Sequence, residues 1–258
     1  MSTIIYPSPI FGPVKSRRLG ISLGINVCPP DGKICSFGCI YCECGFNADH
    51  RPKEKMPGRA RIREALREKL VEMRRDGALP DTLTFSGNGE PTGHPEFPGI
   101  IDDTIALRNE FCPNAKVSVL TNSTRITKEE VFQALLRVDN ALLKLDTVDP
   151  DYIRLVDRPN SRYELPEILR AMERFGSRAV IQTMFLHGSF EGRRVDNTGE
   201  EFVAPWLEEI ARIRPKLVTI YTIDRETPDK DLRKATREEL DRIADRVRSL
   251  GIAAQASY

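Results

Sequence analysis

Residues 82–91 read TLTFSGNGEP, a short β-type run that ends in a turn containing two glycines. Successive side chains of a strand point to opposite faces, so the hydroxyl side chains Thr82, Thr84 and Ser86 share one face and the two apolar side chains between them share the other. The apolar face is suited to packing under helices. The polar face must meet water, a ligand or other polar groups. This stretch predicts a strand in a sheet whose two faces differ.

Five more runs of the same kind recur along the chain, and segments with helical periodicity separate them. Strands that alternate with helices form parallel βα units. The six runs are GISLGINV (20–27), TLTFS (82–86), KVSVL (116–120), ALLKLD (141–146), AVIQTMF (179–185) and LVTIYTI (217–223). A further run, IAAQASY (252–258), is a candidate for one last strand.

The intervening segments carry the start and stop signals of helices. From residue 62, apolar side chains recur on one face while arginine and glutamate fill the other. Thr127 with Glu130, and Thr236 with Glu239, have the spacing of capping boxes that begin helices. The second of these helices is expected to end at Gly251, where a left-handed C-cap favours glycine.

Polar residues also recur on one face of three other predicted strands, those at 116–120, 141–146 and 217–223. Lys144 and Asp146 share a face of the 141–146 run, opposite two leucines. A closed eight-stranded barrel fills its interior with branched apolar side chains. Six strands with a polar face indicate instead an incomplete barrel that is open enough for a polar ligand. The predicted fold is α/β, a partial (β/α)6 TIM-like barrel, and an open sheet with one solvated face is the alternative.

Barrel sites form at the C-terminal ends of the strands. Lys144 and Asp146 lie at such an end, so we expect them either to face the ligand or to pair with each other as a structural ion pair. By the same argument, several polar residues are candidates to line the cavity: Ser118, Asn122, Gln182, Thr219 and Tyr221.

Length and composition favour one globular domain over 1–258, with a short N-terminal extension over 1–19. The chain is 40% hydrophobic and 30% charged, and its 39 Lys and Arg nearly balance its 38 Asp and Glu. A strong field for nucleic acid or anionic lipid is therefore not expected. Because the sequence has no apolar run of about 18 residues and no signal peptide, we expect no membrane partner and a cytoplasmic location, where thiols stay reduced.

Four of the six cysteines stand within CSFGCIYCECG (35–45). In a reducing compartment, clustered cysteines are more often metal ligands or catalytic groups than disulfides. Cys35, Cys39 and Cys42 have the spacing C-x3-C-x2-C, and three thiolates can bind three irons of a 4Fe-4S cluster and leave the fourth open for another ligand. A zinc site completed by Cys44 or His50 is the alternative.

This loop resembles the cluster loop of the radical S-adenosylmethionine (SAM) superfamily, including the aromatic Tyr41 just before the last cysteine. FSGNGEP (85–91) is similar to the Gly-Gly-Glu motif of that family, and the predicted barrel is similar to its fold. GPVKSRRLGISLGIN (12–26) resembles the branch that contains the wyosine-base synthases acting on transfer RNA. The resemblance implies an enzyme in which a reduced 4Fe-4S cluster cleaves SAM to methionine and a 5'-deoxyadenosyl radical, which then abstracts hydrogen from a substrate.

The resemblance also implies roles for individual residues. Cys35, Cys39 and Cys42 would bind the cluster, and Tyr41 would lie by the adenine. Gly87, Asn88, Gly89 and Glu90 would surround the methionine end of SAM, and Asn122, Asp146 and Gln182 would approach the ribose or substrate. The residues expected to take part in catalysis are Glu90, Asn122, Lys144 and Asp146.

Several alternatives stay open at this stage. A spare thiol is the favoured interpretation of Cys44, and a second cluster on Cys28, Cys44 and Cys112 is disfavoured because these residues lack ligand spacing. Arg17 and Arg18 either meet an anionic substrate group or form a solvated turn. The electron is expected from a reductant such as flavodoxin or ferredoxin, and the substrate is a transfer RNA base, a glycyl-radical enzyme or a small molecule. The rival function is an iron-sulfur electron carrier or sensor without SAM chemistry.

Overall fold

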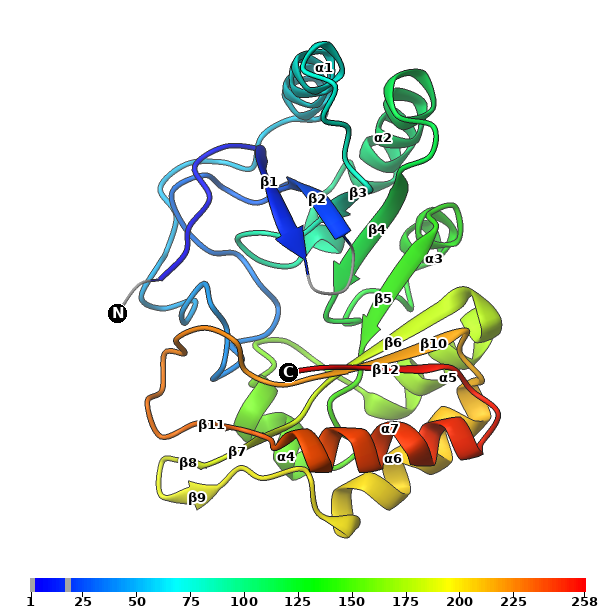
Figure 1. Cartoon of the computed structure of the whole chain (residues 1–258). Coiled ribbons are helices and arrows are strands. Elements are labelled where there is room, and N and C mark those ends of the chain that lie inside the picture. Colours follow the sequence, from blue (N-terminus) through cyan, green and yellow to red (C-terminus); the bar gives the residue numbers. More distant parts are fainter. Residues whose placement is uncertain (1–2, 17–19) are drawn as a thin grey trace.

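The computed structural model describes residues 3–16 and 20–258, which form one curved sheet with helices on its outer side (Figure 1). The strand order is β1-β2-β3-β4-β5-β6-β10-β12, and every neighbouring pair is parallel except β1 and β2. The strands of this sheet are β1 (Ile10–Ser16), β2 (Gly20–Ile25), β3 (Thr82–Phe85), β4 (Lys116–Thr121), β5 (Asn140–Lys144), β6 (Ala179–Met184), β10 (Leu217–Tyr221) and β12 (Ala254–Ser257). Two small antiparallel pairs join β7 (Leu186–His187) to β11 (Arg233–Lys234) and β8 (Ser189–Phe190) to β9 (Arg193–Arg194).

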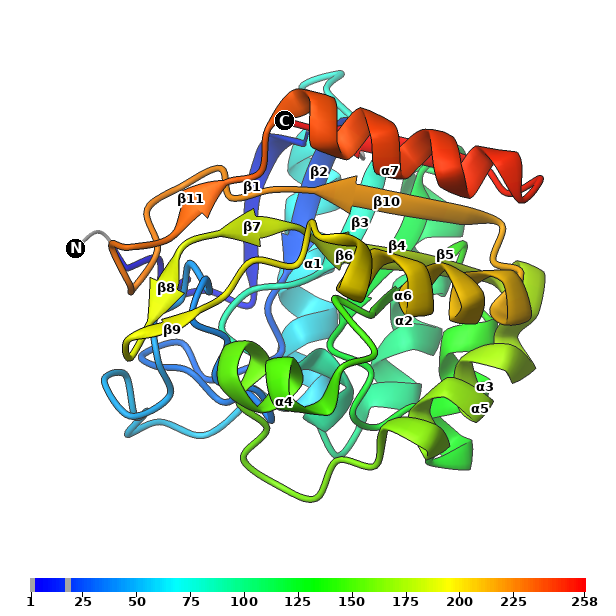
Figure 2. The ribbon, with the colours of Figure 1, turned by 90° about the horizontal axis from the view of Figure 1, so that it is seen from below.

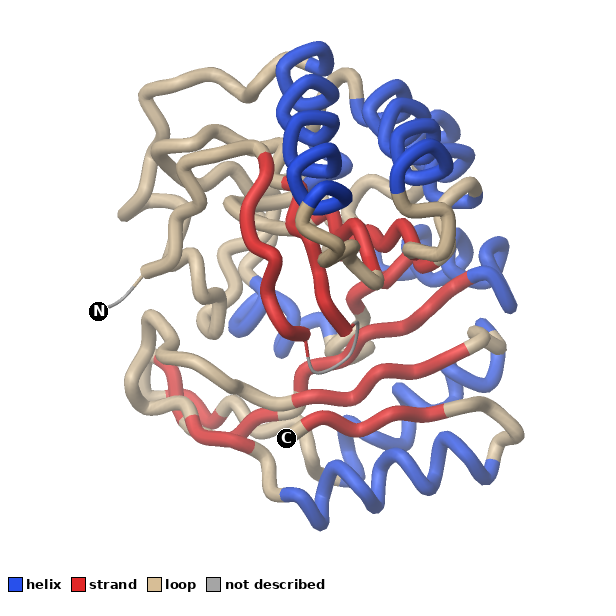
Figure 3. The backbone as a smooth tube through the Cα atoms, turned by 45° about the horizontal axis from the view of Figure 1, so that its top comes forward, coloured by secondary structure: helices blue, strands red, loops and turns tan. Residues whose placement is uncertain are grey.

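The helices lie outside the arc of strands, and the long loops gather at one end of the sheet (Figure 2 and Figure 3). The α-helices are α1 (Arg59–Arg75), α2 (Phe97–Phe111), α3 (Glu129–Leu136), α4 (Pro150–Tyr152), α5 (Leu165–Phe175), α6 (Glu200–Ile213) and α7 (Arg237–Ser249). Short turns of other helix types are η1 (Pro91–Gly93), η2 (Ile153–Asp157) and η3 (Gly176–Arg178). Within the described ranges, no helix has the length and apolar character that crossing a membrane requires.

The six predicted strands and the last candidate strand are confirmed, as β2, β3, β4, β5, β6, β10 and β12. Their order in the sheet follows the chain, and the helices cover one side, so the sheet is a half-barrel of the predicted type and not the open sheet with one solvated face. Strand β1 was not predicted; it forms inside the segment expected to be an extension and pairs with β2. Arg17 and Arg18 lie outside the described residues.

The helix signals were right at one capping box and wrong at the other. At α7, Thr236 accepts from the backbone N–H of Glu239 and the reciprocal bond is present, and Gly251 follows the helix with φ +75°. At α3, the N-cap is Lys128 and not Thr127. A preceding turn, in which Lys128 N donates to Arg125 O at 3.1 Å, includes Thr127 and delays the helix by one residue.

The two faces of the sheet differ as the strand pattern predicted. The outer apolar side chains join one core with the buried faces of the helices, for example Leu83 of β3 with Leu66 of α1. The inner hydroxyls bond to one another: Thr82 Oγ1 lies 3.1 Å from Ser118 Oγ, which accepts from Asn140 Nδ2 at 3.1 Å. Because these groups satisfy each other, the floor of the half-barrel is polar without leaving buried donors unpaired.

Candidate active site

The chain leaves the C-terminal end of β2 into a long loop that carries the three predicted cluster ligands. Cys35, Cys39 and Cys42 are free thiols of intermediate exposure. Backbone turns shape the segment, because Cys42 N donates to Cys39 O at 3.1 Å and Gly45 N to Cys42 O at 2.9 Å. Each of the three thiols is close enough to the other two to affect their ionisation. The loop therefore gathers three sulfurs in one place.

The thiols differ in their surroundings. Burial is the main influence on two of them, and it raises the pKa of Cys35 to about 11 and that of Cys39 well above its usual value. A hydrogen bond from Cys44, together with the nearby Lys33 ammonium, holds the pKa of Cys42 well below its usual value. Among the described residues, no three His, Cys, Asp or Glu side chains converge on a single metal ion. A structural zinc site holds one ion with four such ligands, whereas a cubane binds each of its thiolates through a different iron.

The glycine turn after β3 braces the start of this loop. Ile34 N donates to Asn88 O at 3.0 Å, and Glu90 N donates to Ile34 O at 3.1 Å. Gly89 has φ +147°, and a Cβ atom there would lie 1.8 Å from Ile34 O. The backbone of the cluster loop can approach this closely only because the turn has no side chain at Gly89. The turn thus fixes the residue that precedes Cys35.

A second segment, residues 156–160, pairs with the other side of the cluster loop and is called the strap below. Gly38 N and Ile40 N each donate to strap carbonyls at 3.0 Å, those of Asp157 and Val156. Asn160 N donates to Ser36 O at 3.0 Å, and Asn160 Nδ2 donates to Cys35 O at 2.7 Å. Loop and strap together form a braced unit although more than a hundred residues separate them in the sequence.

Asn88 and Glu90, both predicted at the methionine end of SAM, bond to protein groups. The Asn88 amide donates to Tyr6 O at 2.9 Å and to Pro29 O at 2.8 Å, and its oxygen accepts from Tyr6 N. Glu90 Oε1 accepts from Thr92 N, Thr92 Oγ1 and Thr121 Oγ1, and Oε2 accepts from Asn122 N at 2.6 Å. Burial raises the pKa of Glu90, although these hydrogen bonds act against the rise. Both side chains therefore stabilise the turn itself.

Asn122 follows β4 and lies directly beside the cluster loop. Its amide nitrogen is 3.4 Å from Cys35 Sγ and donates to Ser36 Oγ at 2.9 Å. Its oxygen accepts from Thr124 Oγ1 at 2.8 Å. The fold thus brings Asn122, a predicted site residue, next to Cys35, a predicted cluster ligand.

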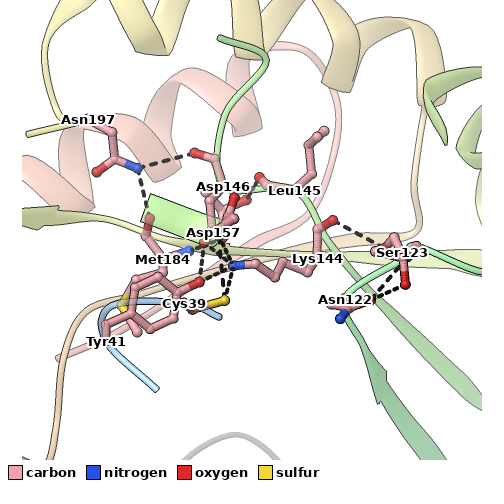
Figure 4. Close-up of polar contacts among 12 residues, drawn as sticks. Cys39, Tyr41, Asn122, Ser123, Lys144, Leu145, Asp146, Asp157, Met184 and Asn197 are labelled. Carbon is pink, nitrogen blue, oxygen red and sulfur yellow. Dashed lines mark hydrogen bonds and ion pairs between the residues drawn. The ribbon is translucent and has the colours of Figure 1, made fainter. Parts of the chain in front are cut away.

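Lys144 and Asp146 form the ion pair that one interpretation of the sequence allowed, with Nζ 2.6 Å from Asp146 Oδ2 (Figure 4). Tyr41 also enters this group, because its hydroxyl donates to Asp146 and contacts Lys144. Asp157 of the strap completes the group at 2.5 Å from Lys144 Nζ. Burial alone would lower the pKa of Lys144, but the two carboxylates and the Cys39 thiol raise it well above its usual value.

Gln182 is buried on β6, where it pairs in register with Lys144 of β5. A cavity of about 250 Å³ opens within the half-barrel. Tyr221 lines this cavity as expected, whereas Ser118 is fully buried in the polar floor below it. The lining residues are Tyr6, Phe11, Val14, Lys15, Ser16, Ser22, Glu43, Thr84, Ser86, Leu120, Met184, Tyr221, Thr222, Asp224 and Arg225.

The three remaining cysteines are buried. Cys28 Sγ lies 3.7 Å from Ile34 O, and Cys44 Sγ donates to Gly87 O at 3.3 Å, so both support the backbone around the cluster loop. Cys112 is the C-cap of α2. Cys28 and Cys44 thus lie beside the cluster loop, whereas Cys112 lies at the end of a helix, so the three thiols belong to different parts of the fold.

Three further residues of the site, Lys33, Asp157 and Asn160, were not predicted from the sequence. Lys33 is adjacent in sequence to the cysteine cluster, so its position near Cys35 was a usable signal. Asp157 and Asn160 carry no such signal, because they reach the site from an irregular segment far along the chain.

Comparison with known proteins identifies the family to which this chain belongs. Residues 30–197 match the family model described as the Radical SAM superfamily. A protein of Brachyspira hyodysenteriae named GTPase Obg is 28% identical over 90% of this chain and 32% of its own length. A UPF0026 protein of Helicobacter pylori is 30% identical over 85% of this chain and 67% of its own length. The chain thus spans about one third of the first relative and two thirds of the second.

Solved structures share the fold. A radical SAM methyltransferase from Sphaerobacter thermophilus has a TM-score of 0.64 at 17% identity, covering 92% of this chain and 66% of that chain. SuiB of Streptococcus suis bound to S-adenosylmethionine has a TM-score of 0.57 at 12% identity, covering 91% of this chain and 46% of that chain. Archaeal TYW1 has a TM-score of 0.52 at 14% identity, covering 88% and 71%.

Proposed function

Because the chain belongs to the radical SAM superfamily, we propose that it cleaves SAM reductively at a 4Fe-4S cluster held by Cys35, Cys39 and Cys42. Membership makes it an enzyme whose cofactors are a 4Fe-4S cluster and SAM. The observation that carries the choice of ligands is the trio of free cysteines on one loop whose backbone is braced on two sides. Soft thiolate sulfur is the donor that iron-sulfur clusters require.

When bound and reduced, the cluster would supply the electron for the reductive cleavage of SAM, and with it the means to abstract hydrogen from a substrate. The chain's own part is to hold the reacting groups in place. In this proposal the backbone of Gly87 and Gly89 borders the methionine end, and Tyr41 borders the adenine. Glu90 positions the site indirectly, through the turn and through Asn122. Its Oε2 accepts a hydrogen bond from Asn122 N at 2.6 Å. The hydrogen bonds that the Glu90 carboxylate accepts from protein groups support this positioning role.

The ribose and substrate side of the site is assigned to Asn122, Asp146 and Gln182, as the sequence resemblance implied. Asn122 lies beside Cys35 Sγ at 3.4 Å, which supports its placement next to the cluster. Asp146 follows β5 by two residues, and Gln182 lies two residues before the end of the neighbouring strand β6. These assignments can be tested with a SAM-bound crystal structure, in which all three side chains should lie within contact of the nucleoside or of the space beyond its 5' carbon.

Radical SAM enzymes use SAM together with an external reductant. For this chain we propose a low-potential carrier such as flavodoxin or ferredoxin, and a substrate that is a transfer RNA base, a glycyl-radical enzyme or a small molecule. The net charge of +1 gives the chain no overall attraction to RNA. An RNA substrate would show an affinity that falls steeply with salt, because phosphate contacts release counterions.

The test is anaerobic reconstitution with iron and sulfide, reduction, addition of SAM, and chromatography for 5'-deoxyadenosine. We expect the wild type to show cubane absorbance and to form the nucleoside. Cys39→Ala should lose the cluster and the product. Cys112→Ala is the matched control, because this buried thiol lies at the end of α2 and should be dispensable for both.

Two outcomes would contradict the proposal. A cluster of unchanged iron content in Cys39→Ala would show that the ligands are assigned wrongly. An intact cluster that neither binds SAM in calorimetry nor forms 5'-deoxyadenosine would favour the electron carrier or sensor.

A further inference from the structure

Lys144 places a buried ammonium group against the sulfur of Cys39. The distance from Nζ to Cys39 Sγ is 3.6 Å, and Nζ also contacts Asp146 Oδ2 at 2.6 Å, Asp157 Oδ1 at 2.5 Å and the Tyr41 hydroxyl (Figure 4). The side chain of Lys144 is 11% exposed, and those of the two aspartates are 1% and 4% exposed. A protonated amine has three N–H donors, and these four acceptors occupy them. No donor of Lys144 is left for a substrate in this arrangement.

The ammonium group is held in position from several sides. Asp146 is itself fixed, because its Oδ1 accepts from Met184 N at 2.9 Å. Asp157 belongs to the strap, whose backbone accepts from Gly38 N. The ring centroid of Phe37 lies 5.6 Å from Lys144 Nζ, which adds a cation–π contact. If one of these partners is removed, the others therefore keep the Lys144 ammonium group close to the Cys39 sulfur.

A second buried lysine also lies near the thiols. Lys33 is 3% exposed, and its Nζ donates to Gly45 O at 2.5 Å. It also contacts the Cys42 thiol and interacts electrostatically with Cys35 and Cys39. Two ammonium groups thus lie near the thiols, and one of them is accompanied by two carboxylates.

Charge near an iron-sulfur cluster changes the free energy of its reduction. Reduction adds one electron, so a nearby cation stabilises the reduced form and an anion destabilises it. A hydrogen bond to a ligating sulfur acts in the same direction as a cation. In a buried site these effects are screened less than at the surface.

We propose that Lys144 is a positioning residue that, held by Asp146 and Asp157 against the Cys39 sulfur, raises the reduction potential of the cluster. This inference rests on the proposed function to the extent that Cys39 is taken as a cluster ligand. It also changes the role expected from the sequence, in which Lys144 faced the substrate as a catalytic group. Asp157 has the opposite effect on the potential, because its carboxylate lies 3.7 Å from the same sulfur.

The test is a redox titration of the reconstituted protein, with the reduced cluster followed by electron paramagnetic resonance. Lys144→Met removes the charge, and we expect the reduction equilibrium to become about tenfold less favourable, a midpoint about 59 mV lower for a one-electron couple. Asp157→Asn should raise the midpoint, and Lys144→Arg should stay close to wild type. Lys116→Met is the matched control, because Lys116 begins β4 and its side chain is 62% exposed.

The opposite signs separate an electrostatic role from a structural one, because a merely distorted site has no reason to shift the two variants in opposite directions. Equal midpoints in wild type, Lys144→Met and Asp157→Asn would overturn the proposal. If Lys144→Met fails to hold a cluster, Asp157→Asn decides, and a midpoint equal to or below that of wild type would overturn it. A wild type without any cluster signal would instead refute the ligand assignment of the proposed function.

Discussion

Replacement of Gly89 by alanine tests whether the glycine turn holds the cluster loop in place. With φ at +147°, the new Cβ atom would lie 1.8 Å from Ile34 O and 2.5 Å from Ile34 C. The clash is with backbone and not with the end of a flexible side chain, so Ile34 must move. Its movement would break the bonds from Ile34 N to Asn88 O and from Glu90 N to Ile34 O. The loop would be released one residue before Cys35.

The cost has two parts. A non-glycine residue in such a sparsely populated backbone region costs about 1–3 kcal/mol. Two lost hydrogen bonds add about 0.5–1.5 kcal/mol each. We therefore expect Gly89→Ala to lower the free energy of unfolding by about 2–6 kcal/mol, a large share of the roughly 5–15 kcal/mol that stabilises a typical domain. We also expect it to lower the iron content after reconstitution, because the first predicted ligand follows the displaced residue.

Gly77→Ala is the matched control. Gly77 also has a positive φ, +69°, but a Cβ atom there would meet nothing within 4 Å. This variant should lose only the backbone term, about 1–2 kcal/mol, and should keep its cluster. Urea unfolding followed by circular dichroism, together with iron analysis, measures both effects. Equal losses of stability in the two variants, with full iron content in Gly89→Ala, would refute the argument that the turn and the loop are locked together.

Two further predictions concern other contacts. Burial acts to lower the pKa of His187, but hydrogen bonds with Glu239 at 2.8 Å and Asp196 at 2.9 Å raise it overall. Its protonation therefore stabilises the fold fully below the unfolded pKa of about 6.5, and this contribution disappears as the pH rises through the folded pKa. His187→Gln should thus lower Tm more at about pH 6 than at about pH 9, and an equal loss at both would contradict the assignment. Asn160→Ala removes the 2.7 Å hydrogen bond to Cys35 O and should lower the free energy of unfolding by about 1 kcal/mol. It should also speed the loss of cluster iron to a chelator. An unchanged rate of iron loss would show that this bond does not hold the loop.

Local patterns were sufficient for the parallel strands because β-type runs alternate with helical segments along the chain, and several of these strands have one apolar and one polar face. They failed at β1, whose sequence IFGPVKS contains a proline without an N–H and a glycine with φ +96°. The pairing with β2 shifts register between Phe11 and Val14, as in a β-bulge. An edge strand interrupted in this way does not show the regular alternation by which the other strands were found.

The residues of the candidate site also fall into two groups, those that a sequence pattern reveals and those that it does not. The cysteines and the glycine turn were visible in the sequence because their spacing itself reflects their chemistry. Asp157 was not visible, since it ends a π-helical turn and precedes Arg158, which has a left-handed backbone with φ +52°. No periodicity applies to such a segment. Only the folded chain brings Asp157 to Lys144 and Cys39.

The way the loop is braced has a consequence for cluster assembly. The glycine turn and the strap hold Ile34, Gly38 and Ile40 mainly through backbone hydrogen bonds. Backbone bonds order the loop without using the sulfur atoms, so the thiols stay available while the chain that carries them is already fixed. An unbraced loop would lose about 1–2 kcal/mol of conformational entropy for each residue ordered by metal binding. If Cys35, Cys39 and Cys42 bind the cluster as proposed, the order that the turn and strap impose leaves a larger part of the metal–thiolate binding free energy as affinity for the cluster.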